Sequence, residues 1–227
     1  MRKFKKIIYG LLVVLSLGLI FNQQLTALLL KTINPPVTIT KQKTPANYDW
    51  QKVNNVSAYD LLKARLNSNK AKFIGLVAIP KLNMSLPISN GVADLNLSLG
   101  AGTLFKNQKM GEGNYALASH FIADNSMKNL LFTPIYYKGA VGQKIYLTDL
   151  EKVYTYQTTK YQKIPATDLS VVQPVTGKKL VTLITCNYTE EAGRVIMQGE
   201  LVKTREWKET PKKIQQYFSA NDTRWVK

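Results

Sequence analysis

The chain opens with a long apolar segment flanked by basic residues. Apolar side chains dominate Ile7–Phe21 and return at Leu25–Leu30 after a short polar break. Residues 7–30 are together long enough to span a bilayer, which takes about 20 apolar residues. The shorter Ile7–Phe21 run also fits a signal peptide, but no small-x-small cleavage site follows it. We therefore predict a cytoplasmic N-terminus at 1–6, a transmembrane signal-anchor at 7–30, and export of the remaining chain.

Periodic patterning is lost between residues 31 and 55, where prolines are frequent, so this stretch is predicted to be an extracytoplasmic spacer. A short helix is predicted from Ser57 to about Asn67. Ser57 is suited to cap it, and apolar residues follow at helical spacing.

The pattern then changes to short apolar or alternating runs separated by turn residues. These predicted strands are Phe73–Ile79, Met84–Ile88, Asn114–Ala118, Lys144–Thr148, Lys152–Thr159, Lys179–Thr185 and Arg194–Val202. Because few helices separate them, we expect a mainly β fold, either a closed barrel or a sandwich, over 56–205. A C-terminal extension at 206–227 is predicted to be partly helical, with Thr210 as the cap and Pro211 at the first helical position.

The chain is strongly basic, which limits the partners it could have. The 227 residues carry a formal net charge of +17. Nucleic acid often binds such a basic chain, but an exported and tethered domain meets anionic lipid headgroups and wall polymers instead. We therefore predict no nucleic-acid partner; simple solubility near the membrane also explains the charge.

The single cysteine and the single histidine are the first candidates for chemistry. Cys186 lies where the apolar stretch LVTLITCNY, residues 180–188, passes into a polar turn, and His120 follows another predicted strand. A lone cysteine cannot form an internal disulfide, and an inert buried thiol is its ordinary role. Beside an imidazole, however, a thiol can attack a carbonyl and the imidazole can protonate the leaving amine.

Other chemistries fit less well. Zinc sites usually take four protein ligands, which one Cys and one His do not supply. A serine nucleophile would need the same histidine, and no Gly-x-Ser-x-Gly elbow is present. Arg194 begins the strand that follows Cys186, so a hairpin would bring the two together. A guanidinium there could stabilise an oxyanion, although an arginine at a strand start is more often a solvated surface residue.

The motifs around these residues resemble those of sortases. Thr182-Leu183-Ile184-Thr185-Cys186 is similar to the family's TLxTC signature, Ala118-Ser119-His120 to the segment with its histidine, and Arg194-Val195-Ile196 to the segment with its arginine. The likeness extends from about Phe73 to Val202. The N-terminal anchor and the absence of an apolar C-terminal segment resemble class A, the housekeeping type.

The resemblance implies an eight-stranded sortase-type β-barrel and a cysteine transpeptidase on the outer face of a Gram-positive membrane. Cys186 would cleave LPxTG-type sorting signals of surface proteins between Thr and Gly. The acyl group would pass to an amino group of a peptidoglycan precursor such as lipid II. His120 would be the general acid and base, and Arg194 would stabilise the oxyanion or the substrate. The resemblance also assigns apolar residues to the Leu-Pro part of the signal: Ala118, Leu169, Val171, Val172 and Ile184.

Some class A sortases bind an activating Ca²⁺ through carboxylates in the loop before the histidine strand. Here residues 105–112 contain one acid, Glu112, and two lysines, whereas calcium takes six to eight oxygen ligands. We therefore predict calcium independence and no cofactor. Two alternatives stay open: a pilin-polymerising sortase or a hydrolase, and a non-catalytic binding domain with a buried Cys186. The sequence leaves the oligomeric state open.

Overall fold

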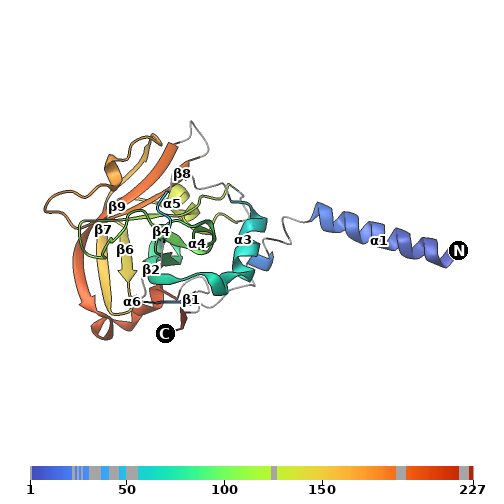
Figure 1. Ribbon diagram of the computed structural model, residues 1–227, viewed down its shortest axis with the longest axis horizontal. Helices are drawn as coiled ribbons and strands as arrows, with labels where there is room; N and C mark the ends of the chain where they lie inside the picture. The colour runs from blue at the N-terminus through green and yellow to red at the C-terminus, as the bar shows by residue number, and fades with distance from the viewer. Residues whose placement is uncertain are drawn as a thin grey trace.

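The computed structural model describes residues 2–21, 24, 26, 28–30, 37–40, 46–49, 56–123, 127–187, 193–219 and 225–226. Its central feature is a closed barrel with the strand order β2-β3-β4-β5-β8-β9-β7-β6 (Figure 1). The strands are β2 (Phe73–Ile79), β3 (Met84–Ser89), β4 (Ala101–Thr103), β5 (Asn114–Ala118), β6 (Lys144–Thr148), β7 (Lys152–Ile164), β8 (Leu180–Asn187) and β9 (Gly193–Glu206). The predicted mainly β class is confirmed, and the closed barrel replaces the sandwich alternative.

All the predicted strands are present. One strand is additional, and two are clearly longer than predicted, of which β9 continues to Glu206, past its predicted end at Val202. β4 was not predicted, because Ala101-Gly102-Thr103 is too short and too small to show an alternating pattern. β7 continues to Ile164, past the predicted end at Thr159, because its second half pairs with β9 from Lys160↔Gln198 to Ile164↔Arg194. Long-range pairing thus extends a strand whose exposed side chains are polar.

Helices are few and short. They are α3 (Ala58–Leu66), α4 (Asp94–Leu99), α5 (Thr133–Lys138) and α6 (Lys212–Tyr217), with 3-10 turns at η2 (Ser68–Lys70), η3 (Pro80–Leu82), η5 (Ser170–Val172) and η6 (Trp207–Glu209). The predicted cap of α3 is confirmed: Ser57 Oγ accepts from the Asp60 N–H at 3.2 Å, and Asp60 Oδ2 accepts from the Ser57 N–H at 3.0 Å. This reciprocal pair is a capping box, which satisfies two otherwise unpaired donors.

The predicted cap of the C-terminal helix is wrong. Pro211 is the N-cap of α6, and the Thr210 hydroxyl instead donates to the Glu206 carbonyl at 2.9 Å. The hydroxyl prefers this carbonyl because η6 turns the chain back toward the end of β9. Phe218, just after α6, is fully buried against the barrel, where its carbonyl accepts from Ser85 Oγ at 2.7 Å.

Strand alternation divides the apolar side chains between two faces. On β5, β8 and β9 one set fills the barrel interior: Tyr115, Leu117, Val181, Leu183, Val195 and Met197. The intervening set packs outside the barrel beneath η5, together with Val171 and Val172: Ala116, Ala118, Ile184 and Ile196. Because successive side chains point to opposite faces, every second residue along these strands continues this outer cluster.

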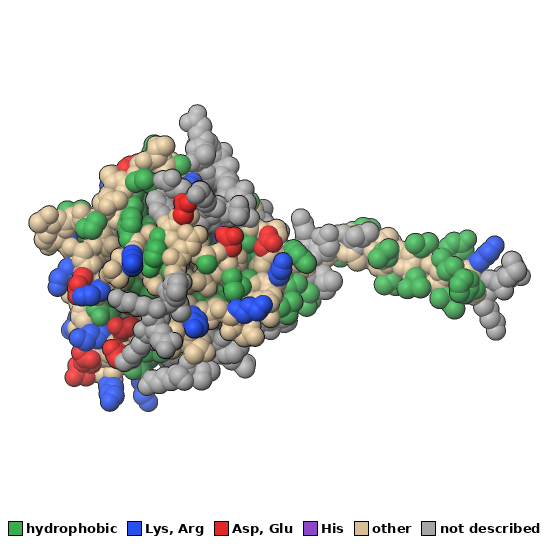
Figure 2. All heavy atoms as spheres, viewed as in Figure 1, with side chains coloured by type: hydrophobic (Ala, Val, Ile, Leu, Met, Phe, Trp, Pro, Cys, Tyr) green, Lys and Arg blue, Asp and Glu red, His purple; other side chains and the backbone are tan. Residues whose placement is uncertain are grey.

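The N-terminal part contains α1 (Arg2–Ile20), drawn in Figure 1 as projecting away from the barrel. Figure 2 shows hydrophobic side chains along its length, and Ile7, Leu11 and Val14 are exposed. Among the described residues, no helix combines the length and the apolar character that crossing a membrane requires.

Within the predicted spacer, two described stretches contact the barrel domain. The Thr40 N–H donates to the Phe73 carbonyl at 2.7 Å, and the Val92 N–H donates to the Asn47 carbonyl at 2.7 Å. β1 (Val37–Thr38) pairs in parallel with β10 (Trp225–Val226). The rest of the spacer lies outside the described residues, so the domain boundaries stay a prediction.

Candidate active site

Cys186 and Arg194 lie opposite each other on neighbouring antiparallel strands. The register pairs Cys186 with Arg194 and Ile184 with Ile196. Cys186 is two residues beyond Ile184, and Arg194 is two residues before Ile196, so both belong to the face of the outer apolar cluster. Both side chains are partly exposed. The hairpin predicted from the sequence therefore brings the thiol and the guanidinium to one end of one face.

His120 reaches the same end of the barrel from β5. This strand runs parallel to β8, with Ala118 paired to Ile184. The pairing continues past the strand end, because the Ser119 N–H donates to the Ile184 carbonyl at 3.3 Å and Thr185 Oγ1 donates to the Ser119 carbonyl at 2.9 Å. The residues that immediately precede His120 and Cys186 are therefore hydrogen-bonded to each other.

Two further contacts fix the backbone around His120. The Ser119 hydroxyl donates to the Gly100 carbonyl at 2.6 Å, and the His120 carbonyl accepts from the Phe132 N–H at 3.2 Å. Ser119 thus ties the end of β5 to the residue that precedes β4. A net hydrogen bond of this kind contributes about 1 kcal/mol.

The imidazole of His120 is buried, with 6% of the residue's surface exposed. Burial lowers the pKa of His120 to about 4, because an imidazolium loses hydration there, while the carboxylates of Asp94 and Asp60 act in the opposite direction. Near neutral pH the resting imidazole is therefore uncharged and can accept a proton. The single histidine thus has the protonation state that a general base requires.

The Arg194 side chain bonds to the main chain of the residue before it. One guanidinium nitrogen, Nη1, donates to the Gly193 carbonyl at 3.0 Å. A guanidinium carries five N–H donors, so this side chain can also donate to a substrate or an oxyanion. Residues 188–192, which join β8 to β9, lie outside the described residues.

A buried polar network holds the loop between β7 and β8 against the barrel. Asn114 Nδ2 donates to the carbonyls of Val171 and Gln173, at 3.0 Å each. Gln198 Nε2 also donates to the Val171 carbonyl, at 3.0 Å. The hydroxyl of Thr182 links the two amides: it donates to Asn114 Oδ1 at 2.7 Å and accepts from Gln198 Nε2 at 2.8 Å. Side chains from β5, β8 and β9 thus hold η5 against the barrel.

The sequence reasoning did not identify Asn114 or Gln198 as contributors to the site. A signal was present for Asn114, since it begins a strand that is otherwise apolar and a buried amide needs hydrogen-bond partners. Gln198 lies among other polar residues of β9 and gave no such signal. The partners themselves were not predictable, because they are backbone carbonyls in and just after η5, which packs there only in the folded barrel.

Four of the five residues predicted to bind the Leu-Pro part of a signal lie together. Ala118, Val171, Val172 and Ile184 belong to the outer apolar cluster, whereas Leu169 lies half-buried at the start of η5, outside that cluster. Val172 and Ile184 are only 1% and 3% exposed, so they also pack η5 onto the strands. Their contact with substrate stays a prediction.

The described residues contain no group of three or more His, Cys, Asp or Glu side chains that could hold a metal ion. In the loop before β5, the Glu112 carboxylate lies 3.6 Å from Lys109 Nζ, and both side chains are largely exposed. Calcium independence is untested by this arrangement and stays a prediction.

The site is therefore a partly exposed thiol, a buried neutral imidazole and a guanidinium at one end of a β-barrel, which defines a thiol acyl-transfer enzyme as the class to compare with. Residues 77–202 match the Sortase domain family. The chain is 35% identical over 225 residues to sortase A of Streptococcus agalactiae, covering 92% of this chain and 89% of that protein. It is 35% identical over 210 residues to sortase A of Listeria monocytogenes, covering 88% of this chain and 92% of that one.

Comparison with solved structures also finds sortases. A solved structure of Listeria monocytogenes sortase A superposes with a TM-score of 0.58 at 38% identity, over 64% of this chain and 97% of that chain. The chain belongs to the sortase family. It is a sortase cysteine transpeptidase, similar over most of its length to proteins named sortase A.

Proposed function

We propose that this sortase is a membrane-anchored class A enzyme that cleaves LPxTG-type sorting signals between Thr and Gly and transfers the new acyl end to an amino group of a peptidoglycan precursor such as lipid II. The observation that carries the proposal is the register at the strand ends. Cys186 is paired with Arg194, and the residue before Cys186 is bonded to the residue before His120.

The first half-reaction is acylation of Cys186. Its sulfur attacks the Thr carbonyl carbon, a C–S bond forms, and the C–N bond to Gly breaks. The thiol proton reaches the departing Gly nitrogen through His120, whose neutral resting state lets it accept that proton. This base and acid role is supported by burial, which holds the pKa of His120 at about 4.

In the second half-reaction an amine attacks the thioester, the C–S bond breaks, and Cys186 is regenerated. Both steps pass through a tetrahedral species whose oxygen is negative. Arg194 stabilises that oxygen, since its residue is paired with Cys186 and a guanidinium offers several N–H donors in a fixed geometry.

The Leu-Pro part of the signal binds on the outer apolar cluster. Ala118, Val171 and Ile184 belong to the cluster that continues to Cys186, and an apolar slot leading to a polar reacting group suits a Leu-Pro-x-Thr segment. η5 forms the wall of this slot, and Leu169 contributes from its start.

The location follows from the N-terminus. The apolar segment from residue 7 to residue 30 serves as a single-pass anchor, with basic residues keeping 1–6 in the cytoplasm and the barrel facing the cell wall. The exposed hydrophobic side chains of α1 support this assignment, because soluble surfaces rarely carry such a contiguous apolar area. The net charge of +17 suits a surface rich in anionic lipid and wall polymer.

A cleavage and transfer assay tests the proposal. The full chain in detergent is given a fluorogenic LPxTG peptide, alone and with hydroxylamine. We expect slow cleavage that hydroxylamine accelerates, an acyl hydroxamate product, and loss of both in Cys186→Ala. Cleavage that persists in Cys186→Ala would exclude the thiol mechanism, and cleavage unaffected by any amine would reduce the enzyme to a hydrolase.

A further inference from the structure

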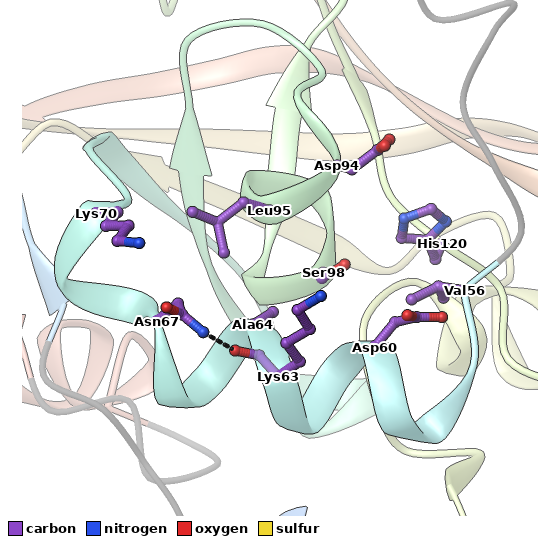
Figure 3. A pocket seen from close by; sticks show the side chains of 10 residues that line it. All are labelled: Val56, Asp60, Lys63, Ala64, Asn67, Lys70, Asp94, Leu95, Ser98 and His120. Carbon is purple, nitrogen blue, oxygen red and sulfur yellow. Dashed lines mark hydrogen bonds between the residues drawn. The ribbon is translucent and has the colours of Figure 1, made fainter.

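A pocket that includes His120 in its lining has no role in the account so far. It lies between α3 with η2 and α4, and its volume is about 560 Å³. Pockets of roughly 300–1,000 Å³ commonly hold small ligands or a few residues of peptide. In Figure 3 His120, Asp94 and Asp60 lie toward one end of this α3–α4 pocket, and Lys70 lies toward the other.

His120 is the feature that separates this pocket from an ordinary groove between helices. Its imidazole lines the pocket, although only 6% of the residue's surface is exposed. Among the described residues the imidazole makes no hydrogen bond, so a ligand in this space can bond to it.

The charges at this end of the pocket are negative. Asp60 and Asp94 come from different helices, yet both act electrostatically on the His120 imidazole. Hydrogen bonds from Ser57 lower the pKa of Asp60, so that carboxylate stays ionised at neutral pH. Asp94 is exposed at the start of α4. A cation that enters here meets two carboxylates and one ammonium, that of Lys63 beside Asp60, so the local charge is negative overall next to a neutral base.

The rest of the pocket differs in character. Val56, Ala64 and Leu95 supply apolar walls, and Lys63 and Lys70 add positive charge. Lys70 lies in η2, beyond the end of α3, and at the far end of the pocket from Asp60 (Figure 3). Carboxylates at one end and a lysine at the other suit a short peptide that carries an ammonium at one end and an anionic group at the other.

We propose that the α3–α4 pocket binds the amine acceptor of transpeptidation, with the acceptor's ammonium between Asp94 and Asp60 beside His120, and its anionic end toward Lys70. The inference rests on the proposed function and extends it, because it assigns a second substrate site that shares only His120 with the residues proposed for the sorting signal and its cleavage.

The proposed transfer to the amine involves two protons and one exchange of bonds. An alkyl ammonium must lose a proton before it can attack, and neutral His120 accepts that proton. The amine nitrogen then bonds to the thioester carbonyl carbon, the C–S bond to Cys186 breaks, and the nitrogen loses a second proton, which the departing thiolate takes. His120 releases the first proton to solvent. The products are an amide, the free thiol and one proton.

The test compares two amines in the full-length protein in detergent, with an LPxTG peptide held constant. Triglycine is an ammonium with a carboxylate at the far end, whereas hydroxylamine is small and uncharged near neutral pH. We expect Asp94→Asn and Asp60→Asn each to raise KM for triglycine at least fivefold more than KM for hydroxylamine. Asparagine keeps the size of both side chains, and in Asp60→Asn the amide oxygen can still accept from Ser57.

A third variant tests the far end. Lys70→Gln is expected to raise KM for triglycine about threefold but not KM for triglycine amide, which lacks the carboxylate. Glu209 is an exposed acid in η6 outside the pocket, so Glu209→Gln is the control for a change of one charge. Its KM for each of the three amines should equal that of the wild type.

Equal effects on triglycine and hydroxylamine in the Asp94 and Asp60 variants would overturn the pocket assignment. That outcome is distinct from failure of the proposed function, in which the wild type itself forms no hydroxamate. Thermal unfolding of each variant separates a binding effect from loss of the fold.

Discussion

His120 joins two regions that are built differently. On one side, the ends of β5, β8 and β9 fix the reacting groups through backbone register and through the bond between Thr185 and Ser119. On the other side, the α3–α4 pocket is lined largely by charged and polar side chains from two short helices. The chemical step therefore depends on main-chain geometry at the strand ends. The choice of acceptor depends on surface charges, which substitution can alter without disturbing the barrel.

The largest expected effect is at Arg194, on the strand-end side. Arg194→Ala removes the proposed donor for the oxyanion and should reduce kcat/KM for an LPxTG peptide by about 10²–10³-fold. Arg194→Lys should recover little of this loss, because an ammonium cannot reproduce the fork geometry of a guanidinium. Arg205→Ala, on the same strand but paired with Val153, is the matched control. Full activity of Arg194→Ala would remove Arg194 from the mechanism.

The next effect concerns the network beneath η5. Asn114→Ala leaves the Val171 and Gln173 carbonyls and the Thr182 hydroxyl short of a partner, and should lower the free energy of unfolding by roughly 2–3 kcal/mol. Because the groove wall loosens while the strand ends stay paired, KM for the LPxTG peptide should rise more than kcat falls. Peptide-cleavage kinetics and chemical denaturation measure the two effects.

Gln162→Ala, a half-buried amide on β7 outside the network, is the control for that experiment. If Asn114→Ala lowered kcat alone and left KM unchanged, the network would support the reacting groups and not the substrate groove.

The pH dependence of stability should report the burial of His120 itself. The pKa of His120 is about 4 in the folded chain against about 6.5 when unfolded, so the unfolded chain takes up the proton first as pH falls. Its contribution to stability is therefore complete above about pH 6.5 and is lost between about pH 6.5 and 4, by up to about 3 kcal/mol.

Subtracting the unfolding free energy of His120→Asn from that of the wild type at each pH isolates this contribution from the carboxylates. A difference that stays constant from about pH 7 to about pH 4 would mean that the imidazole is well hydrated. Asp94→Asn should lower the pKa of His120 further, because one of the two opposing carboxylates is removed.

The smallest expected effect is that of calcium. Added Ca²⁺ or a chelator should leave peptide cleavage unchanged, since residues 105–112 provide only Glu112 as a carboxylate and η5 is held by side-chain amides. An activity that requires added Ca²⁺ and is silenced by a chelator would contradict this prediction.

The two regions also differ in how far the sequence predicts them. Apolar and alternating runs predict most strands, and the position of Cys186 and Arg194 at either end of one hairpin follows from these runs. The parallel pairing of β5 with β8 does not, because no local pattern encodes a contact between strands so far apart in the chain. For Cys186 and His120 the family motifs supplied that link.

The α3–α4 pocket escaped sequence reasoning altogether. The helix containing Asp60 is predictable from its capping box, but α4 is short, and its packing beside α3 is a tertiary contact. Long-range packing likewise produced β4, which pairs with β3 and β5. At Thr210 one local contact replaced another, because its hydroxyl bonds to the Glu206 carbonyl four residues earlier instead of capping α6.

Mass spectrometry of the acylated protein tests the central claim most directly. The full chain is incubated with an LPxTG peptide without an added amine, quenched in acid and digested. The account predicts a thioester-linked acyl group ending at Thr on the peptide that contains Cys186, removed by hydroxylamine. No adduct in a protein that still consumes the peptide, or an adduct on any other residue, would contradict it.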